Sequence, residues 1–307
     1  MHETLKAIVR TKRREVDGAI ERVPPADLRA RVRDLPLPRD FLAAVAPGLA
    51  ASAQPPAVAP RRVEAAAAVP EAALIAEIKR ASPSQGALRA ALDPAARAKA
   101  YAGAGAKALS VLTDREFFRG SPDDLRAARA AAPVPVLRKD FTIDPYQVWE
   151  TRAMGADAVL LIARILTRGQ MQDLGGLARE LGLTALFEVH RDDELPAVLD
   201  CSPRLVGVNS RDLDTFAVSF EDCLRIGRTL PRDVGRVAES GIGTREEVER
   251  AAACGYNAVL VGEALIRSGD PAAKVRELLG TATDGPPPFS TATLSDLKDL
   301  PPPPGKP

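Results

Sequence analysis

Two opposite charges lie at the end of an apolar segment in the stretch LIAEIKRASPSQG, residues 74–86. The apolar residues predict a buried strand, and Glu77 and Lys79 are two positions apart, so both side chains project from the same face. A buried ion pair often only breaks even against an apolar replacement, so stability alone gives little reason for it. A carboxylate beside an ammonium is instead typical of sites that transfer protons or fix charges.

Polar residues also close most of the other apolar segments. They are Thr113, Asp114, Lys139, Glu188, Asn209, Glu239, Ser240 and, directly after Gly262, Glu263. Each charged residue alone is typical of an ion pair or a loop cap. Lys79 and Lys139 together with Glu77, Glu188 and Glu239 are not explained in that way, because burying charges destabilises a fold unless they are well paired. The set predicts a site that needs fixed charges.

The elements that must position these residues repeat eight times. Apolar runs occur at residues 74–79, 107–112, 134–139, 157–162, 184–189, 204–209, 235–240 and 257–262. Their starts are 20 to 33 residues apart, and the gaps hold Ala-, Arg- and Glu-rich helical segments. In three of the gaps a glycine closes the helix just before the next strand, as in YAGAGAKALSVL.

Continuous apolar strands that alternate with helices predict a parallel sheet covered on both faces. Eight units of about 25 residues favour a closed (β/α)8 TIM barrel in the α/β class. An open Rossmann-type sheet is the weaker alternative, because no G-x-G-x-x-G follows an early strand. The carboxyl ends of barrel strands meet at one mouth, so we expect the polar residues to converge there.

The sequence predicts a single barrel domain over residues 1–280, with an N-terminal helical extension at 1–72 and the barrel proper at 73–280. Residues 3–23 carry apolar side chains at helical spacing, and the KRR cluster at 12–14 is expected on a solvated helix face. Short helices are compatible with the Pro- and Ala-rich stretch that follows. Residues 281–307 hold eight prolines and predict a disordered tail.

Composition excludes several function classes. Lys plus Arg is 42 against 41 for Asp plus Glu, so no net field favours nucleic acid or an anionic membrane. The three cysteines form no C-x-x-C pair and are expected to be small core residues in a reducing cytoplasm, with neither a metal site nor disulfides. No run approaches the roughly 18 apolar residues of a membrane span, so we expect a soluble cytoplasmic protein.

Glycines follow the last two predicted strands, in ESGIGTREE and VGEALI. In barrels these two loops often present backbone N–H groups to a phosphate. Ordinary turn chemistry is the alternative explanation for the glycines. A phosphorylated small molecule is therefore a candidate ligand, provided that the Glu263 carboxylate points away from it.

Eight motifs together resemble the indole-3-glycerol phosphate synthase family of tryptophan biosynthesis. In order along residues 73–268 they are EIKRASPS, VLTDREFFRGS, VLRKDF, GADAVLLI, FEVH, VNSRDL, ESGI and LVGEAL. The segment LKAIVRTKRREV is similar to the helix that precedes the barrel in this family and lies across its mouth. The resemblance implies decarboxylating ring closure and dehydration of 1-(2-carboxyphenylamino)-1-deoxyribulose 5-phosphate, without metal or cofactor.

The resemblance also implies roles for the charged residues. Lys139 is expected to protonate the ketone oxygen during ring closure, and Glu188 to act as the base during dehydration. Lys79 is expected to neutralise substrate anions or to protonate the departing hydroxyl, and the sequence leaves open which lysine acts at which step. Glu77 is expected to hold one or both ammonium groups in place.

The remaining roles concern substrate binding. Asn209 and Glu239 are expected to position the substrate by hydrogen bonds, and Ser82 and Arg211 to face its carboxylate. Four residues map onto the phosphate loops: Ser240, Gly241, Gly262 and Glu263. Phe118 and Phe141 are either walls for the anthranilate ring or ordinary packing residues.

His190 is expected to point away from Glu188, and Tyr146, Gln147 and Trp149 are expected to organise a helix.

Two other function classes stay open. One is a Schiff-base aldolase or sugar-phosphate isomerase on the same barrel, and the aldolase would require a neutral lysine. The other is a non-catalytic barrel that serves as a binding subunit, which predicts loss of at least one charged residue of the site. A monomer or weak homodimer is expected, and association with other tryptophan-pathway enzymes is left open.

Overall fold

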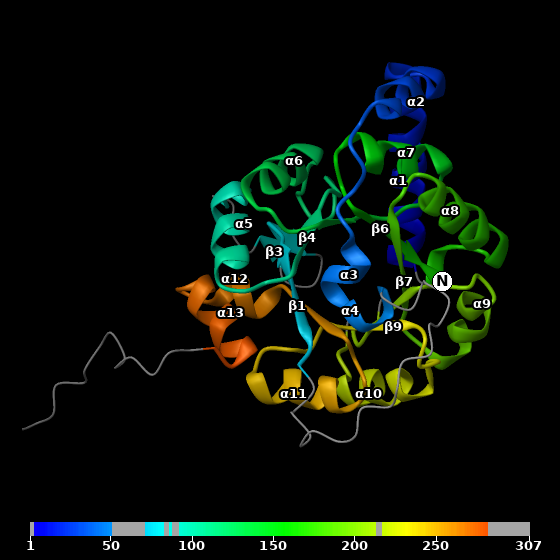
Figure 1. Ribbon diagram of the computed structural model, residues 1–307. Helices are drawn as coiled ribbons and strands as arrows, with labels where there is room; N and C mark the ends of the chain where they lie inside the picture. Colours follow the sequence, from blue (N-terminus) through cyan, green and yellow to red (C-terminus); the bar gives the residue numbers. More distant parts are fainter. Residues whose placement is uncertain (1–2, 51–70, 83–85, 88–91, 213–216, 282–307) are drawn as a thin grey trace, which may run out of the picture.

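The computed structural model describes residues 3–50, 71–82, 86–87, 92–212 and 217–281 of the 307-residue chain. Within these residues, eight parallel strands form a closed barrel in which β1 pairs with both β4 and β10 (Figure 1). The strands are β1 Ala73–Ile78, β4 Ala108–Leu112, β5 Val136–Lys139, β6 Ala158–Ile162, β7 Thr184–Val189, β8 Leu205–Asn209, β9 Gly235–Glu239 and β10 Ala258–Val261. This confirms the predicted TIM barrel. The short hairpin of β2 Ala81–Ser82 and β3 Gly86–Ala87 was not predicted. The predicted tail lies, except for Thr281, outside the described residues.

Helices surround the barrel in the gaps between strands. They are α5 Pro94–Gly103, α6 Pro122–Ala131, α7 Pro145–Ala153, α8 Arg168–Glu180, α9 Leu195–Leu199, α10 Phe220–Thr229, α11 Arg245–Ala253, α12 Glu263–Arg267 and α13 Pro271–Leu279. Most begin at a side chain that accepts a backbone N–H, such as Ser121 for α6 and Thr244 for α11. The predicted glycine stops are confirmed at Gly155 and Gly255, whose φ angles are 82° and 89°.

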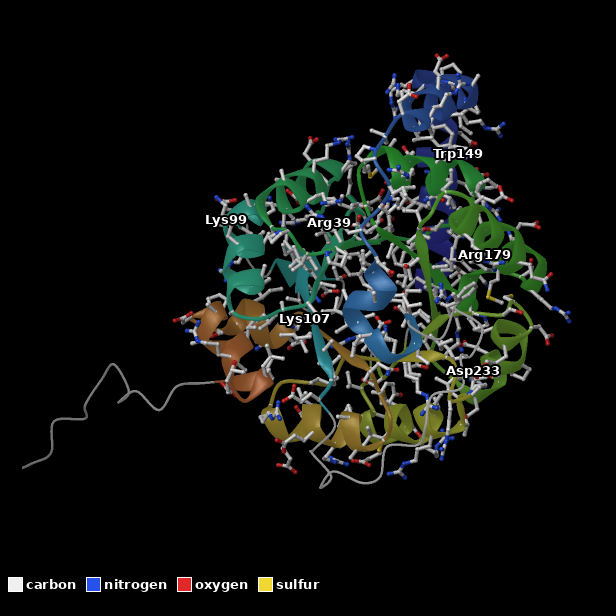
Figure 2. The ribbon with its side chains drawn as sticks, in the orientation of Figure 1. Arg39, Lys99, Lys107, Trp149, Arg179 and Asp233 are labelled. Atoms are coloured by element: carbon white, nitrogen blue, oxygen red, sulfur yellow. The ribbon has the colours of Figure 1, made fainter. Side chains whose placement is uncertain are left out.

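The core has two layers that follow from strand alternation. On β1, Leu74 and Ala76 pack outward against the helices, and Ile75 packs inside the barrel. The interior cluster also contains Leu137, Leu160, Leu186, Val237 and Leu260. Charged side chains such as Lys99, Arg179 and Asp233 lie on the outside (Figure 2). The barrel is therefore a packed core, and chemistry is confined to its ends.

The N-terminal extension contributes helices to both ends of the barrel. It consists of α1 Glu3–Arg22, α2 Pro25–Arg33, α3 Phe41–Val45 and α4 Pro47–Ala50. Figure 1 looks at the end covered by α3 and α4, with α1 more distant. Phe41 and Val45 are fully buried in the interior cluster, and Leu5 and Ile8 of α1 join the same cluster. The predicted amphipathic helix is thus confirmed, and its apolar face packs on the barrel.

Asp157, just before β6, ties the extension to the sheet. Its buried carboxylate accepts the backbone N–H groups of Arg39 and Val136, at 2.7 and 2.8 Å, and Nη2 of Arg129 at 3.2 Å. Arg39 itself donates to two backbone carbonyl oxygens of the loop between α6 and β5. One carboxylate therefore joins the segment before α3 to the amino ends of two strands.

Asp157→Ala is expected to lower the free energy of unfolding by about 2–4 kcal/mol, because it leaves buried donors without an acceptor. Urea unfolding followed by circular dichroism measures the change. The matched control is Asp233→Ala, which alters an exposed carboxylate and should change stability by less than about 0.5 kcal/mol. Equal midpoints for the two variants would contradict the anchoring role.

The described helices and the three cysteines bear on the expectations drawn from composition. Of the described helices, none is long and apolar enough to cross a membrane. The cysteines are all free, and Cys201 and Cys223 are buried as expected, whereas Cys254 is partly exposed. Cys254, which follows the last residue of α11, packs against the edge of the core cluster.

Candidate active site

A cavity of about 160 Å³ opens at the carboxyl ends of the strands. It collects thirteen of the fourteen predicted site residues. These are Glu77, Lys79, Phe118, Lys139, Phe141, Glu188, Asn209, Arg211, Glu239, Ser240, Gly241, Gly262 and Glu263. The exception is Ser82 in β2, whose side chain lies outside what the structure describes. The convergence expected from the strand ends is therefore present, except that Thr113 and Asp114, which follow β4, do not line the cavity.

Lys139 lies at the centre of the charged cluster. Its Nζ contacts Oε2 of Glu188 and lies 2.9 Å from Oε2 of Glu239. All three side chains come from strand ends and are nearly inaccessible, with 13%, 2% and 1% of each side chain exposed. An ammonium and two carboxylates so shielded from water interact strongly and hold one another in fixed positions.

The protonation states of this cluster follow from burial and from the neighbouring charges. Burial alone would lower the pKa of Lys139, but the carboxylates of Glu188, Glu239 and Glu77 raise it well above its ordinary value. Burial would raise the pKa of Glu188, but the Lys139 ammonium lowers it far below the usual range. Burial raises the pKa of Glu239 to about 8; the Lys139 ammonium opposes this shift, and the charge of Glu188 reinforces it.

The raised pKa of Glu239 predicts a pH-dependent stability. Its folded pKa of about 8 exceeds the ordinary 4.5, so its stabilising contribution is complete below 4.5 and is lost as pH rises towards 8. Glutamine stays neutral throughout. In melting experiments between about pH 5 and pH 9, Glu239→Gln should therefore gain stability relative to the unmodified protein as pH rises. A difference in melting temperature that does not vary with pH would contradict the shift.

Glu77 and Lys79 form the second charged pair of the cavity. Oε1 of Glu77 lies 2.6 Å from Nζ of Lys79, which confirms that the two side chains share a face of the strand. A Cβ atom on Gly262 would lie 2.3 Å from this Oε1. The glycine after β10 therefore leaves the space that the Glu77 carboxylate occupies, a reason for glycine that the sequence did not reveal.

Gly207 on β8 has the same function for Glu239, and sequence reasoning missed it. A Cβ atom at this position would lie 2.1 Å from Oε1 of Glu239. A glycine in the middle of an apolar strand often marks a close approach of another group, so LVGVN carried the signal.

Asn209, Ser240 and Gly241 form a hydrogen-bonded rim after β8 and β9. Oδ1 of Asn209 accepts hydrogen bonds from Ser240 Oγ at 2.8 Å and from the Arg211 N–H at 3.0 Å. Ser240 and Gly241 both have positive φ angles, 66° and 69°, and Ser240 is a non-glycine residue in this region. Such backbone strain is frequent at functional sites. The Glu263 carboxylate lies 3.4 Å from Nη2 of Arg211 and 3.2 Å from Nε of Arg267.

The apolar side of the cavity combines barrel and extension. The rings of Phe118 and Phe141 lie with centroids 6.1 Å apart, and both line the cavity. Thr4, Leu5 and Ile8 of α1 add to the lining. The barrel supplies its remaining members, which are Leu112, Asp140, Leu160, Ile162, Ile242, Leu260 and Val261. The three residues of α1 were not predicted individually, because helical periodicity indicates an apolar face without saying what it covers.

Two sequence interpretations are wrong. His190 was expected to point away from Glu188, but residues two apart in a strand share a face, and its Nε2 lies 3.3 Å from Oε1 of Glu188. The KRR cluster was expected to be solvated, but only Arg13 and Arg14 are exposed, whereas Lys12 is 2% exposed. In contrast, Tyr146, Gln147 and Trp149 do lie in α7, where Gln147 completes the capping box with Asp144.

Comparison with known proteins identifies the family. The family model described as "Indole-3-glycerol phosphate synthase" matches residues 5–278. An indole-3-glycerol phosphate synthase of Albidiferax ferrireducens is 48% identical over 282 residues, covering 92% of this chain and all of the relative. Another, from Polaromonas naphthalenivorans, is 45% identical over 280 residues, covering 91% of this chain and all of the relative.

Solved structures at low identity share the fold alone. The 3-hexulose-6-phosphate synthase of Salmonella typhimurium aligns with a TM-score of 0.56 at 14% identity, covering 68% of this chain and 98% of that one. A second structure titled 3-hexulose-6-phosphate synthase gives 0.55 at 16% identity, covering 69% and 100%. The family model matches nearly the whole chain, and the two relatives named above are 45% and 48% identical to it. This chain therefore belongs to the indole-3-glycerol phosphate synthase family.

Proposed function

We propose that the charged cluster at the mouth converts 1-(2-carboxyphenylamino)-1-deoxyribulose 5-phosphate to indole-3-glycerol phosphate, carbon dioxide and water. The observation that carries this proposal is the contact of the Lys139 ammonium with two buried carboxylates inside the cavity. An acid and a base held in one enclosed site are what a ring closure followed by a dehydration requires.

In the first step the ring carbon that bears the carboxylate attacks the ketone carbon. The carbonyl electron pair moves to oxygen, and Lys139 donates the proton that turns this oxygen into a hydroxyl. The carboxylate then leaves as carbon dioxide, and its bonding electrons restore the aromatic ring. The charge of Glu188 in particular keeps the pKa of Lys139 raised, which supports a cationic acid.

In the second step the hydroxyl leaves as water and the pyrrole ring forms. The hydroxyl oxygen takes a proton from an acid, for which Lys79 is the candidate. Oε1 of Glu77 holds the Lys79 ammonium in place, at 2.6 Å from Nζ. Glu188 removes the proton that the five-membered ring must lose as its double bond forms. Its lowered pKa supports an ionised carboxylate before the reaction, and removal of the Lys139 proton in the first step would make it more basic.

Substrate binding is assigned to the remaining groups at the rim. Backbone N–H groups at Ser240, Gly241, Gly262 and Glu263 would receive the phosphate, with the Glu263 carboxylate directed to Arg211 and Arg267. Arg211 and Ser82 would face the substrate carboxylate. Asn209 would position the sugar hydroxyls, and Phe118 and Phe141 would enclose the aromatic ring. No metal or cofactor takes part in these steps.

The purified protein incubated with this substrate should produce indole fluorescence and release one equivalent of carbon dioxide. Absence of both at saturating substrate would overturn the proposal. The Schiff-base alternative is tested by borohydride in the presence of substrate, because only an imine is trapped on a lysine. The raised pKa of Lys139 disfavours that alternative, which requires a neutral amine.

The cellular setting completes the proposal. The chain would work in the cytoplasm as a monomer or weak homodimer, alone or in association with other enzymes of tryptophan biosynthesis. Its near-zero net charge of +1 supports a small-molecule substrate without a nucleic-acid or membrane partner. Light scattering over a range of protein concentrations measures the oligomeric state.

A further inference from the structure

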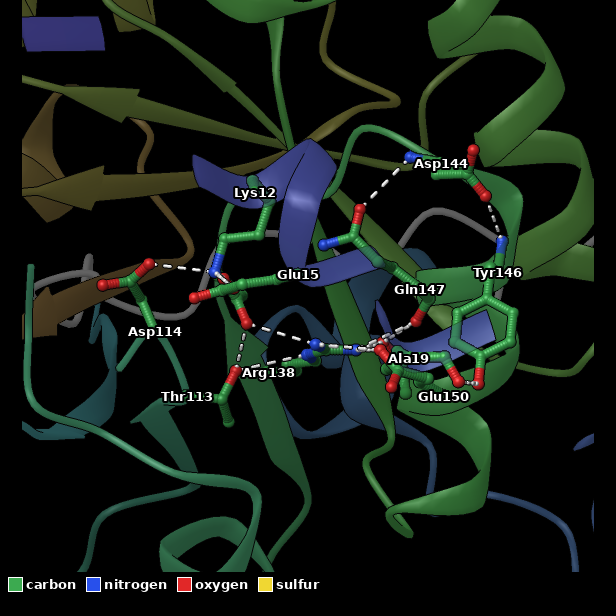
Figure 3. A network of polar contacts seen from close by, with 12 residues as sticks. Lys12, Glu15, Ala19, Thr113, Asp114, Arg138, Asp144, Tyr146, Gln147 and Glu150 are labelled. Carbon is green, nitrogen blue, oxygen red and sulfur yellow. Dashed lines mark hydrogen bonds and ion pairs between the residues drawn. The ribbon is translucent and has the colours of Figure 1, made fainter. Parts of the chain in front are cut away.

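Lys12 on α1 is a buried cation outside the catalytic cavity. Its Nζ lies 2.9 Å from Oδ2 of Asp114, 2.9 Å from Oδ1 of Asp140 and 2.6 Å from Oε2 of Glu15. Figure 3 shows Lys12 beside Asp114 and Glu15. Asp114 and Asp140 are 0% and 4% exposed, so the Lys12 ammonium compensates two buried carboxylates of the barrel, the second of them together with Arg138. Because buried ion pairs are weak contributors to net stability, this arrangement calls for another explanation.

The Asp114 contact leads to one aromatic wall of the cavity. Oδ1 of Asp114 accepts hydrogen bonds from the N–H groups of Phe117 and Phe118, at 2.8 and 3.1 Å. Its other oxygen is the one that Lys12 contacts. The carboxylate therefore holds the turn that carries Phe118, whose ring lines the cavity.

The Asp140 contact leads to the other wall. Oδ1 of Asp140 accepts the Phe141 N–H at 2.8 Å, and Oδ2 accepts Oγ1 of Thr113 at 2.6 Å and lies 3.1 Å from Nη2 of Arg138. Asp140 and its neighbours in the chain, Lys139 and Phe141, all line the cavity. Asp140 thus fixes the backbone between the proposed acid and the second ring.

Neighbouring charges favour the ionised forms of Lys12 and Asp140. Burial alone would lower the pKa of Lys12, but the carboxylates of Asp140, Asp114 and Glu15 raise it above its ordinary value. Burial would raise the pKa of Asp140, but Arg138 and Lys12 lower it below the usual range. The helix that carries Lys12 also supplies Leu5 and Ile8 to the cavity lining. One side of α1 therefore contacts both the cavity and the supports of its two rings.

We propose that Lys12 is a positioning residue that sets the spacing of Phe118 and Phe141, so that α1 determines how well the site accepts the aromatic ring of the substrate. This inference rests on the proposed function for the identity of that ring. It predicts an effect on substrate affinity, because Lys12 does not line the cavity and the reacting groups keep their own partners.

The test is Lys12→Met, which removes the charge and keeps an unbranched apolar side chain. The matched control is Lys6→Met on the same helix, because Lys6 is 47% exposed and pairs only with Glu3 among the described residues. Lys12→Met should raise KM by about 10- to 100-fold with kcat within about threefold, and Lys6→Met should change neither by more than about twofold. Lys12→Arg should recover part of the lost affinity.

Trp149 reports whether α1 stays in place. It is the only tryptophan of the chain and packs with Val16, Tyr146 and their neighbours at the contact of α1, α2 and α7. An unchanged emission maximum in Lys12→Met shows that the helix remains docked, so that the kinetic change reflects the lost ion pairs. If the emission shifts or the variant does not fold, Asp114→Asn decides, since an amide oxygen can still accept the N–H groups of Phe117 and Phe118.

For Asp114→Asn, a KM raised by about threefold or more supports the proposal, and an unchanged KM overturns it. For a folded Lys12→Met, an unchanged KM, or a fall in kcat at unchanged KM, also overturns it. Failure of the proposed function is distinct, because the unmodified protein would then form no indole product and neither kinetic constant could be measured.

Discussion

Lys139→Met is expected to lower kcat by about 10²- to 10⁴-fold, the usual range for loss of a general acid. Methionine matches the length of the lysine stem but cannot protonate the ketone oxygen. Affinity for an unreactive analogue with the ketone reduced to an alcohol should stay within about tenfold, because the phosphate and ring contacts remain. The assays are indole fluorescence for turnover and fluorescence titration for analogue binding.

Lys107→Met is the matched control for this variant. Lys107 is exposed just before β4, at the end of the barrel opposite the cavity, and is labelled in Figure 2. This variant should retain wild-type kinetics. Near wild-type turnover in Lys139→Met would remove the acid assignment. Loss of analogue binding together with turnover would instead assign Lys139 to substrate binding.

Glu188→Gln is expected to slow the dehydration by about 10²- to 10⁴-fold and the decarboxylation by much less. Glutamine preserves the size of the side chain and can still accept a hydrogen bond from Lys139, but it cannot take up a proton. In a single turnover, release of carbon dioxide should therefore precede the rise in indole fluorescence. The unmodified enzyme should show the two signals much closer together.

The control for Glu188→Gln is Glu180→Gln, which makes the same chemical change at the exposed end of α8. It should leave both signals unchanged. Equal slowing of carbon dioxide release and indole formation by Glu188→Gln would argue against a late base. That outcome would indicate that Glu188 acts only by holding Lys139 in position.

The sequence was most informative where a short-range rule applies. Strand alternation predicted that Glu77 and Lys79 share a face, and the same rule, wrongly applied, produced the error for His190. The position of polar residues at strand ends predicted which side chains meet, because parallel strands of a barrel have all their carboxyl ends at one mouth.

Features that depend on partners far apart in the chain were not predictable in this way. Lys12 lies at helical spacing with Ile8, Val9 and Val16, so periodicity places it on the apolar face of α1. Only the docking of α1 shows that this face brings Lys12 to Asp114 and Asp140. Asp157 gives no sign in the sequence that it accepts the backbone N–H of Arg39. In both cases the partners are close in space but remote in the sequence, so no local pattern indicates them.

The two-ended packing of the extension has a consequence for how the chain folds. Phe41 and Val45 share an interior cluster with Ala258 and Leu260, although more than two hundred positions separate them along the printed sequence. A ribosome releases the first helices long before β10 exists, so their contacts cannot be completed during most of synthesis. Contacts between residues so far apart in the sequence slow folding. The first helices can therefore complete their packing only after the last strand has closed the barrel.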